Sequence, residues 1–429
     1  MGSLGSSIDE QVIDDQIQAR LQLFSESPCG RENDIPFFVA NTTKVVQQHQ
    51  RWTHALPHIH PFYAVKCNPD KRLLQLLADM GVNFDCASLA EIEQVLEMGV
   101  DPSRIIFAHP CKAPSALDIA ARRGVRRTTF DNADELDKIQ RISPGMELLL
   151  RIYVQDHGAK VALGTKFGAP MEVTQALLEK ARRAGLKIIG VSFHIGSGAS
   201  DPNAFVTAVQ DAKRVFEDGK ALGFNMHMLD IGGGFEDSNF ETMAYPLRKA
   251  IIREFPSSVT LIAEPGRFYA SGFYTMVCQV IARRTQAGTM NSTLPDMLYL
   301  NDGLYGCFSM GWSENGIFVP TLVVPRGKSS TVSREWTPHR YSIWGPTCDS
   351  IDCISKEVVM DQEVKVGDWL KFQDMGGKPF HSPPDFWRSD CLLDGEIIFE
   401  LILHLIAYTI SASSRFNGFP NTYAIILLE

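Results

Sequence analysis

The sequence has no apolar run long enough to cross a membrane. Its longest such run, at 397–406, includes Glu400 and His404 and is much shorter than the roughly 20 residues a spanning helix needs. The N-terminal text MGSLGSSIDEQ lacks the apolar core of a secretory signal. These two absences predict a cytoplasmic protein without a membrane partner.

The sequence also lacks an excess of positive charge and closely spaced pairs of cysteines. The net charge of -9 argues against a nucleic-acid partner. The nine cysteines are scattered, without CxxC pairs or the spacing of metal ligands, so reduced thiols and no metal site are expected. What the sequence does have is length, because 429 residues with 45% hydrophobic content can form two domains with substantial cores.

Short apolar segments alternate with helix-like segments from about residue 60 onward. Continuous apolar strands that alternate with helices indicate a parallel sheet, and eight such units predict a closed (β/α)₈ barrel. An open doubly wound sheet is the alternative. The expected strands are FYAVK (62–66), NFDCA (83–87), RIIFA (104–108), TTF (128–130), ELLLRIY (147–153), IIGVSFH (188–194), HMLDI (227–231) and VTLIAE (259–264).

The pattern changes after Arg267, where strand-like, turn-rich text predicts a β domain. The expected organisation is an N-terminal segment (1–34) that partly joins the β domain, a barrel (35–272) and the β domain itself (273–429).

Polar residues follow several predicted strands, at the end of a parallel barrel where its chemistry is found. Lys66 ends the first strand, and a desolvated ammonium costs several kcal/mol unless it is paired or chemically changed. Glycine-rich turns at 230–235 and 263–268 follow strands seven and eight, where barrels commonly hold a phosphate. The turn HIGSG (194–198) adds a hydroxyl to the same rim. Tight turns that need glycine for φ > 0 are the alternative explanation.

A lysine opposite a phosphate site and an acidic residue predicts pyridoxal phosphate. Lys66 would form an imine with the cofactor, and Glu264 could keep the pyridine nitrogen protonated so that the ring accepts electrons. The alternative for Lys66 is a structural ion pair with Asp85 or Glu91.

Seven ordered motifs resemble the eukaryotic ornithine decarboxylases. That family combines a pyridoxal-phosphate barrel with a C-terminal β domain, in an alanine-racemase-like fold. The resemblance covers the chain from about residue 30 onward, with one interruption. Its motifs are PFYAVKCN (61–68), FDCASLAEI (84–92), GVSFHIGSG (190–198), LDIGGGF (229–235), AEPGRFY (263–269), YLNDGLYG (299–306) and WGPTCDSID (344–352).

The resemblance implies a role for each cofactor residue. Lys66 should form the imine, His194 should stack on the pyridine ring, and Glu264 should bind its nitrogen. Asp85 and Arg151 should order the lysine side of the site. The phosphate should be held by Ser197, Gly233, Gly234, Gly266, Arg267 and Tyr408.

The resemblance also implies an obligate homodimer with shared sites. Cys348 should protonate the product carbanion, and Asp349 and Tyr305 should bind the substrate, both Cys348 and Asp349 reaching into the partner's site. A thiol that titrates near pH 8.5 is a reasonable acid at neutral pH. An ordinary buried cysteine is the alternative for Cys348.

Two stretches depart from the family's text. Ser313 and Glu314 stand where the family has a Tyr-Asp pair, so a longer carboxylate should bind the distal amine, which leaves substrate length open. Residues 377–406 interrupt the family's text before Tyr408. A retained intron translated in frame and a surface loop are the two explanations, and either could displace Tyr408 from the phosphate.

The leading hypothesis is decarboxylation of a basic amino acid, L-ornithine foremost, to putrescine and CO₂ in polyamine biosynthesis. Lysine decarboxylase and diaminopimelate decarboxylase are the alternative enzymes. The antizyme inhibitors, relatives that lack catalysis, share the Ser-Glu pair, but they lose cofactor residues that are present here. The resemblance also implies an antizyme-like regulatory partner at 117–130, where arginines cluster, and a solvated basic helix end is the alternative explanation of this cluster.

Overall fold

A computed structural model describes residues 2–26, 35–155, 158–160, 163–286, 294–313, 316–324, 338–377, 407–416 and 419–428. The chain forms two compact units, a barrel unit (Gln47–Ala270) and a sheet unit (Met1–Val46 with Ser271–Glu429). The barrel unit begins at Gln47 rather than at residue 35, because strand β1 (Phe37–Asn41) is hydrogen-bonded within the sheet unit.

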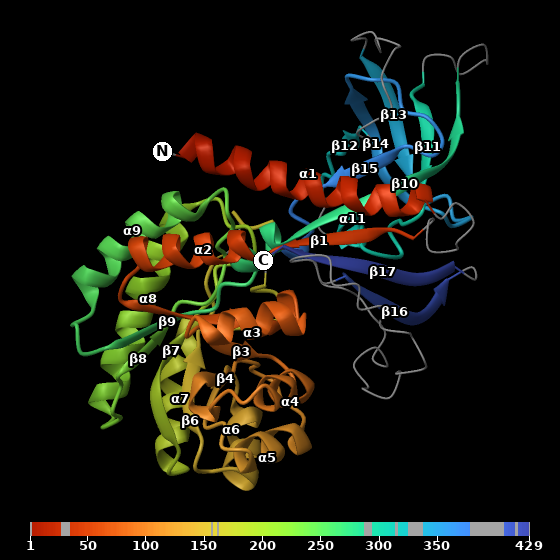
Figure 1. Cartoon of the computed structure of the whole chain (residues 1–429). Helices are drawn as coiled ribbons and strands as arrows, with labels where there is room; N and C mark the ends of the chain where they lie inside the picture. The colour runs from red at the N-terminus through yellow and green to blue at the C-terminus, as the bar shows by residue number, and fades with distance from the viewer. Residues whose placement is uncertain are drawn as a thin grey trace. The chain divides into compact units, whose positions relative to one another are not determined.

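The barrel unit is a closed barrel of eight parallel strands in chain order, as the alternating pattern predicts (Figure 1). The open doubly wound sheet is therefore excluded. The strands are β2 (Ile59–Ala64), β3 (Asn83–Cys86), β4 (Ile105–Phe107), β5 (Arg127–Phe130), β6 (Glu147–Arg151), β7 (Lys187–Ser192), β8 (Met228–Asp230) and β9 (Thr260–Ala263).

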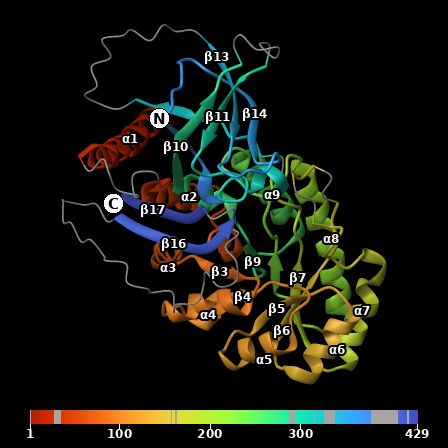
Figure 2. The same cartoon turned by 90° about the vertical axis from the view of Figure 1, so that its right-hand side faces the viewer.

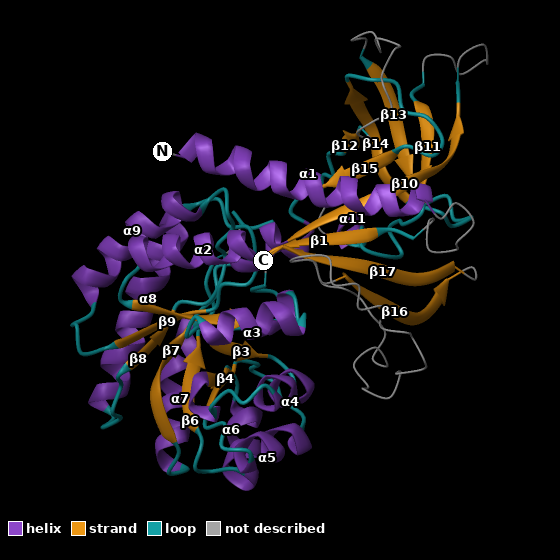
Figure 3. Ribbon diagram, viewed as in Figure 1, coloured by secondary structure: helices purple, strands orange, loops and turns teal. Residues whose placement is uncertain are grey.

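Helices surround these strands (Figure 3). Several of them begin at a side-chain cap, as at α4, where Ser88 accepts from the N–H of Glu91 and Glu91 accepts from the N–H of Ala87. Several helices end at a glycine with positive φ, such as Gly81 and Gly185. The helices are α2 (Thr42–Ala55), α3 (Lys71–Asp79), α4 (Leu89–Glu97), α5 (Pro114–Arg122), α6 (Ala133–Ile142), α7 (Met171–Arg183), α8 (Pro202–Ala221), α9 (Phe240–Glu254) and α10 (Arg267–Ala270).

The barrel interior is filled by apolar side chains from its strands. Burial on both faces explains why these strands read as continuous apolar runs rather than as alternating ones. Gly190 in β7 is required by close approach, because a Cβ there would lie 1.9 Å from the carbonyl oxygen of Met228 in β8. One buried cluster comprises Phe62, Ile106, Ala108, Leu149, Ile189, Met228 and Ile262.

The first strand is shorter than predicted. Strand β2 ends at Ala64, and Val65–Cys67 form a 3₁₀ turn that carries Lys66. The prediction of a strand through Lys66 is therefore wrong by two residues. The turn moves the lysine off the pleated strand and onto the rim.

The sheet unit is built around a mixed sheet in the order β14-β13-β11-β10-β1-β17-β16, with β15 pairing β10 and β12 (Figure 2). Strand β1 pairs antiparallel with β10 and parallel with β17. The remaining elements are β10 (Tyr274–Arg284), β11 (Asp296–Leu300), α11 (Met310–Ser313), β12 (Thr321–Val323), β13 (His339–Trp344), β14 (Cys353–Met360), β15 (Trp369–Phe372), β16 (Ala407–Phe416) and β17 (Phe419–Leu428).

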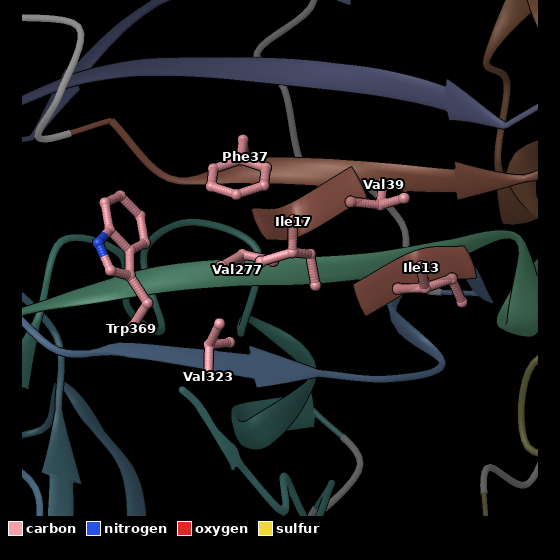
Figure 4. Packing of buried hydrophobic residues seen from close by; sticks show 7 residues of the cluster. All are labelled: Ile13, Ile17, Phe37, Val39, Val277, Val323 and Trp369. Carbon is pink, nitrogen blue, oxygen red and sulfur yellow. The ribbon is translucent and has the colours of Figure 1, made fainter. Parts of the chain in front are cut away.

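Helix α1 (Gly2–Glu26) packs on this sheet. Ile13 and Ile17 point toward Phe37 and Val39 of β1, in a cluster that also contains Val277, Val323 and Trp369 (Figure 4). Lys371 Nζ lies 2.5 Å from Asp14 Oδ1 and fixes the helix from the side. Among the described residues, no helix is both long and apolar enough to span a membrane.

Candidate active site

The C-terminal ends of the barrel strands bring most of the predicted cofactor residues together. Because parallel strands of a barrel all end on one rim, residues far apart in sequence become neighbours there. Asp85 lies in β3, Arg151 ends β6, His194 follows β7 and Glu264 follows β9. Lys66 joins them from the turn after β2.

Lys66 is paired with a buried carboxylate. Its Nζ lies 2.8 Å from Asp85 Oδ2, and Asp85 is fully buried while the lysine side chain is 49% exposed. Burial acts to lower the pKa of Lys66, but the charge of Asp85 and its hydrogen bond to the ammonium contribute to raising that pKa above its ordinary value. The second oxygen, Asp85 Oδ1, is buried without a hydrogen-bond partner among the described residues. The ion pair expected as an alternative therefore exists, and it leaves the amine open to a reactant.

Asp230 and Glu264 form a second acidic pair. Asp230 is fully buried and accepts from Ser192 Oγ and from the N–H of Gly232, each at 2.9 Å. Burial, followed by the charges of Asp230 and Asp85, raises the pKa of Glu264 well above its usual range. Glu264 therefore holds a proton and donates it to a hydrogen bond with Asp230.

His194 is held neutral. Its Nδ1 accepts from the N–H of Gly196 at 3.0 Å, so this nitrogen carries no proton. Burial, followed by the positive charges of Arg151 and Lys66, lowers the pKa of His194 well below its usual range. The ring also lies against the backbone, because a Cβ at Gly233 would stand 2.8 Å from His194 Nε2.

The glycine turns lie close to one another and leave little room for side chains. Gly232 and Gly234 have φ values of 64° and 112°, which favour glycine. A Cβ at Gly234 would be 3.0 Å from the carbonyl oxygen of Gly196, so the turns after β7 and β8 are adjacent. Gly266 packs against the lysine turn, since its Cβ would be 2.9 Å from Cys67 Cβ.

Arg267 and Ser197 flank these turns. Arg267 is the first residue of α10 and lies 3.2 Å from Glu236 through Nη1 and Oε1, with 17% of its side chain exposed. Ser197 is half-buried in the turn after β7. On the other side of the rim, the guanidinium of Arg151 lies 5.2 Å from the centre of the Phe167 ring.

The predicted substrate residues lie in the sheet unit. The hydroxyl of Tyr305 donates to Asp349, and this hydrogen bond lowers the pKa of Asp349 and raises that of Tyr305 to about 12. Cys348 is exposed next to them. Glu314 lies outside the described residues. Only the backbone of Tyr408 is described, in β16 opposite Ile425, and 378–406 lie outside the described residues.

Sequence reasoning did not identify two carboxylates that organise these loops. Glu236 lies in the turn after β8 and contacts both Arg267 and Lys160. Asp352 is 1% exposed and accepts from the N–H of Leu304 and the Oγ1 of Thr347, each at 2.7 Å. Both residues stand inside quoted motif neighbourhoods, but a charged residue beside glycines gives no sign of its partners. Within the described part of the chain no group of His, Cys, Asp and Glu residues could hold a metal ion.

Comparison with known proteins agrees with this geometry. Residues 42–271 match the family described as pyridoxal-dependent decarboxylase, pyridoxal binding domain. The chain belongs to this family, within the group that contains the eukaryotic ornithine decarboxylases.

Individual relatives cover most of the chain. An ornithine decarboxylase of Neurospora crassa is 44% identical over 98% of this chain and 86% of its own length. Antizyme inhibitor 2 of Xenopus laevis is 40% identical over 91% and 80%. A crystal structure of the Paramecium bursaria Chlorella virus arginine decarboxylase bound to agmatine has a TM-score of 0.77 at 34% identity, covering 86% of this chain and 95% of that one.

The residues present fit pyridoxal phosphate. The amine of Lys66 lies beside Asp85, whose Oδ1 is buried without a hydrogen-bond partner among the described residues. The protonated Glu264 and the neutral His194 lie at the same end of the barrel. The glycine turns after β7 and β8 lie close together, and Arg267, which pairs with Glu236 of the turn after β8, supplies a guanidinium that suits a phosphate. The protein is thus a pyridoxal-phosphate-dependent amino-acid decarboxylase.

Proposed function

We propose that this chain decarboxylates a basic amino acid, L-ornithine foremost, to release putrescine and CO₂. The observation that supports this most directly is the division of charge in the barrel: a cationic amine on Asp85, a neutral His194 and a protonated Glu264. The names of the relatives point the same way, since both an ornithine decarboxylase and an arginine decarboxylase are similar to this chain.

The bound cofactor supplies an aldehyde for the substrate amine and a ring that accepts the electron pair released when the carboxylate leaves as CO₂. Lys66 would anchor the aldehyde end, and Asp85 keeps Lys66 Nζ protonated before the cofactor binds. Glu264 would bind the ring nitrogen, and the neutral His194 would support the ring face without adding positive charge. The phosphate would be held by Ser197, Gly233, Gly234, Gly266, Arg267 and Tyr408.

The acidic residues of the sheet unit would bind the ammonium group at the far end of the substrate. Because Tyr305 donates to Asp349 and lowers the pKa of that carboxyl, Asp349 remains ionised over the working pH range. A carboxylate suits an amine at the end of a substrate and repels the distal carboxylate of diaminopimelate. Arg151 would order the lysine side, Glu314 would add a second carboxylate, and the Cys348 thiol would be the proton donor for Cα.

We also propose a cytoplasmic homodimer in which Cys348 and Asp349 of each subunit complete the partner's site. Two observations support a partner at this surface. Cys348 is exposed, and Ile351 of the same loop is 49% exposed, while elsewhere in the sheet unit Ile317 is 88% and Val319 is 71% exposed. Within the described residues, Cys86, Cys278 and Cys348 form no disulfide, which suits a reducing compartment.

A substrate panel tests the activity. The purified protein with pyridoxal phosphate is incubated with carboxyl-labelled ornithine, lysine, arginine and diaminopimelate, and CO₂ is counted. Ornithine is expected to give the highest kcat/KM. A version lacking 377–406 is assayed beside it, because that segment immediately precedes Tyr408. Borohydride reduction followed by peptide mapping should label Lys66, and a label elsewhere contradicts the assignment.

A regulatory, non-catalytic protein is the second candidate, because an antizyme inhibitor is 40% identical to this chain. Cofactor absorbance without CO₂ release from any substrate would favour it. An antizyme-like partner at 117–130 would meet fewer free cations than the sequence suggests, since Arg122 pairs with Asp118 and Arg127 lies 5.5 Å from the Phe62 ring centre.

A further inference from the structure

A short part of the loop between β6 and α7 is fastened to the turn after β7. The carbonyl oxygen of Gly158 accepts from the Ser200 N–H at 2.9 Å and from Ser200 Oγ at 2.8 Å. A Cβ at Gly158 would lie 3.3 Å from Asp201 Cβ, so the two backbones are in close contact. This loop, 158–160, therefore lies over the turn that carries Ser197.

Lys160 extends from this loop across the glycine turn. Its Nζ lies 2.7 Å from Glu236 Oε2. A Cβ at Gly198 would come within 2.7 Å of Lys160 Cδ and 2.9 Å of Glu236 Oε1, which places both side chains directly over Gly198. The glycine at 198 is thus needed to let the ion pair form.

Glu236 joins two cations with its two oxygens. Oε2 contacts Lys160, and Oε1 lies 3.2 Å from Arg267 Nη1. The side chain of Lys160 is 59% exposed, whereas those of Glu236 and Arg267 are only 15% and 17% exposed. The carboxylate therefore lies inside the phosphate end of the site, with its neutralising lysine at the surface.

The backbone fixes Glu236 in this place. Its N–H donates to Asn239 Oδ1 at 2.7 Å, and Asn239 Nδ2 donates to the carbonyl oxygens of Ala199 at 2.8 Å and Gly234 at 3.1 Å. Asn239 thereby ties the turns after β7 and β8 together. The Glu236 backbone is thereby held beside both turns, within reach of Arg267.

A carboxylate on the phosphate-binding arginine opposes a phosphate there, because both anions use the same guanidinium. We propose that Glu236 and Lys160 set the affinity of this site for the cofactor's phosphate. Lys160 neutralises Glu236 and so leaves Arg267 available to the phosphate; without Lys160, Glu236 competes with it. This inference rests on the proposed function, since it requires pyridoxal phosphate on the glycine turns.

A double-mutant cycle tests the pair. Apo-protein is titrated with pyridoxal phosphate, and separately with pyridoxal, which lacks the phosphate; the Kd is read from cofactor absorbance for wild type, K160M, E236Q and K160M/E236Q. K160M should weaken pyridoxal phosphate binding by about three- to tenfold, given the partly exposed position of the lysine. In the E236Q background the same change should have almost no effect. The affinity for pyridoxal should stay unchanged throughout.

Lys180→Met is the matched control, because Lys180 forms a surface pair with Asp137 at 2.7 Å on α7. It should leave both Kd values unchanged. Equal weakening by K160M in both backgrounds, or equal loss of pyridoxal and pyridoxal phosphate, overturns the inference while the cofactor assignment survives. A wild-type protein that binds no pyridoxal phosphate overturns the proposed function itself.

Discussion

At the scale of single residues, the barrel rim places a shared proton between Glu264 and Asp230. Asp230 already accepts from Ser192 Oγ and the N–H of Gly232, so it is the better stabilised anion, and the proton remains on Glu264. A buried acid that keeps its proton at neutral pH can serve as a hydrogen-bond donor. This is the residue-scale feature on which the proposed cofactor chemistry depends.

Replacing Glu264 with Gln should raise the melting temperature of the apo-protein at neutral pH and lower the rate of decarboxylation. The pKa of Glu264 is raised in the folded state, so its contribution to stability is full below the unfolded value of 4.5 and is lost as pH rises through the folded pKa. Apo E264Q should lack this loss and melt at a higher temperature than wild type at neutral pH. Its decarboxylation rate should fall by about 10²-fold.

Thermal melts of the apo-proteins from pH 5 to pH 8, together with kcat, check this expectation. Glu97→Gln, at an exposed position at the end of α4, is the control and should follow wild type in both measurements. Parallel melting curves for wild type and E264Q across this pH range would show that Glu264 is ionised in the folded protein.

At the scale of elements, the loop with Cys348 and Asp349 is fixed by Asp352. This buried carboxylate accepts from the N–H of Leu304 and from the Oγ1 of Thr347 at 2.7 Å, and from the N–H of Thr347 at 3.2 Å. It thereby joins the loop before β14 to the loop that carries Tyr305. Two segments of the sheet unit that are distant in sequence are positioned by one side chain.

Asp352→Ala should release these loops. It leaves one buried and two partly buried donors without their acceptor, which should lower the free energy of unfolding by about 2–4 kcal/mol. At temperatures where the variant is folded, kcat should fall while the absorbance of the bound cofactor is retained, because the barrel residues are untouched. Urea unfolding and steady-state kinetics measure the two effects. Asp361→Asn, at an exposed position after β14, should change neither.

Gly190→Ala should damage the barrel at the β7–β8 pairing. The added Cβ would lie 1.9 Å from the Met228 carbonyl oxygen, and neither strand can move without losing its hydrogen bonds. We expect a loss of about 3 kcal/mol or more, or no folded protein. Gly145→Ala has no atom within 4 Å of its Cβ and should unfold like wild type in the same urea titration.

At the scale of the whole molecule, mixing inactive variants tests the shared sites. K66A removes the cofactor amine and C348A removes the proposed proton donor, each in a different part of the chain. If both residues act in one site built from two subunits, mixed dimers contain one intact site. Random exchange then restores about a quarter of the wild-type activity.

Activity after refolding or prolonged incubation of the 1:1 mixture, compared with each variant alone, provides the measurement. A mixture as inactive as its components, with subunit exchange shown by a tagged copy, would place both residues within one subunit's site.

The amino-acid sequence by itself determined the barrel, because eight continuous apolar segments separated by capped amphipathic helices have few other ways to be buried. It also placed Lys66, His194 and the glycine turns at the ends of strands, which is the end of a parallel barrel where its chemistry is found. The family resemblance supplied roles that periodicity alone cannot give.

Only the tertiary structure decided which side chains pair with one another. Sequence placed Lys66 at the end of a strand, but packing turned the chain at Val65 and set the amine on Asp85. It also brought Glu236 between Lys160 and Arg267, and Asp352 beneath Leu304 and Thr347. Propensity and periodicity act over neighbouring residues, whereas ion pairs and shared protons depend on distances between loops that only the closed barrel and the packed sheet fix.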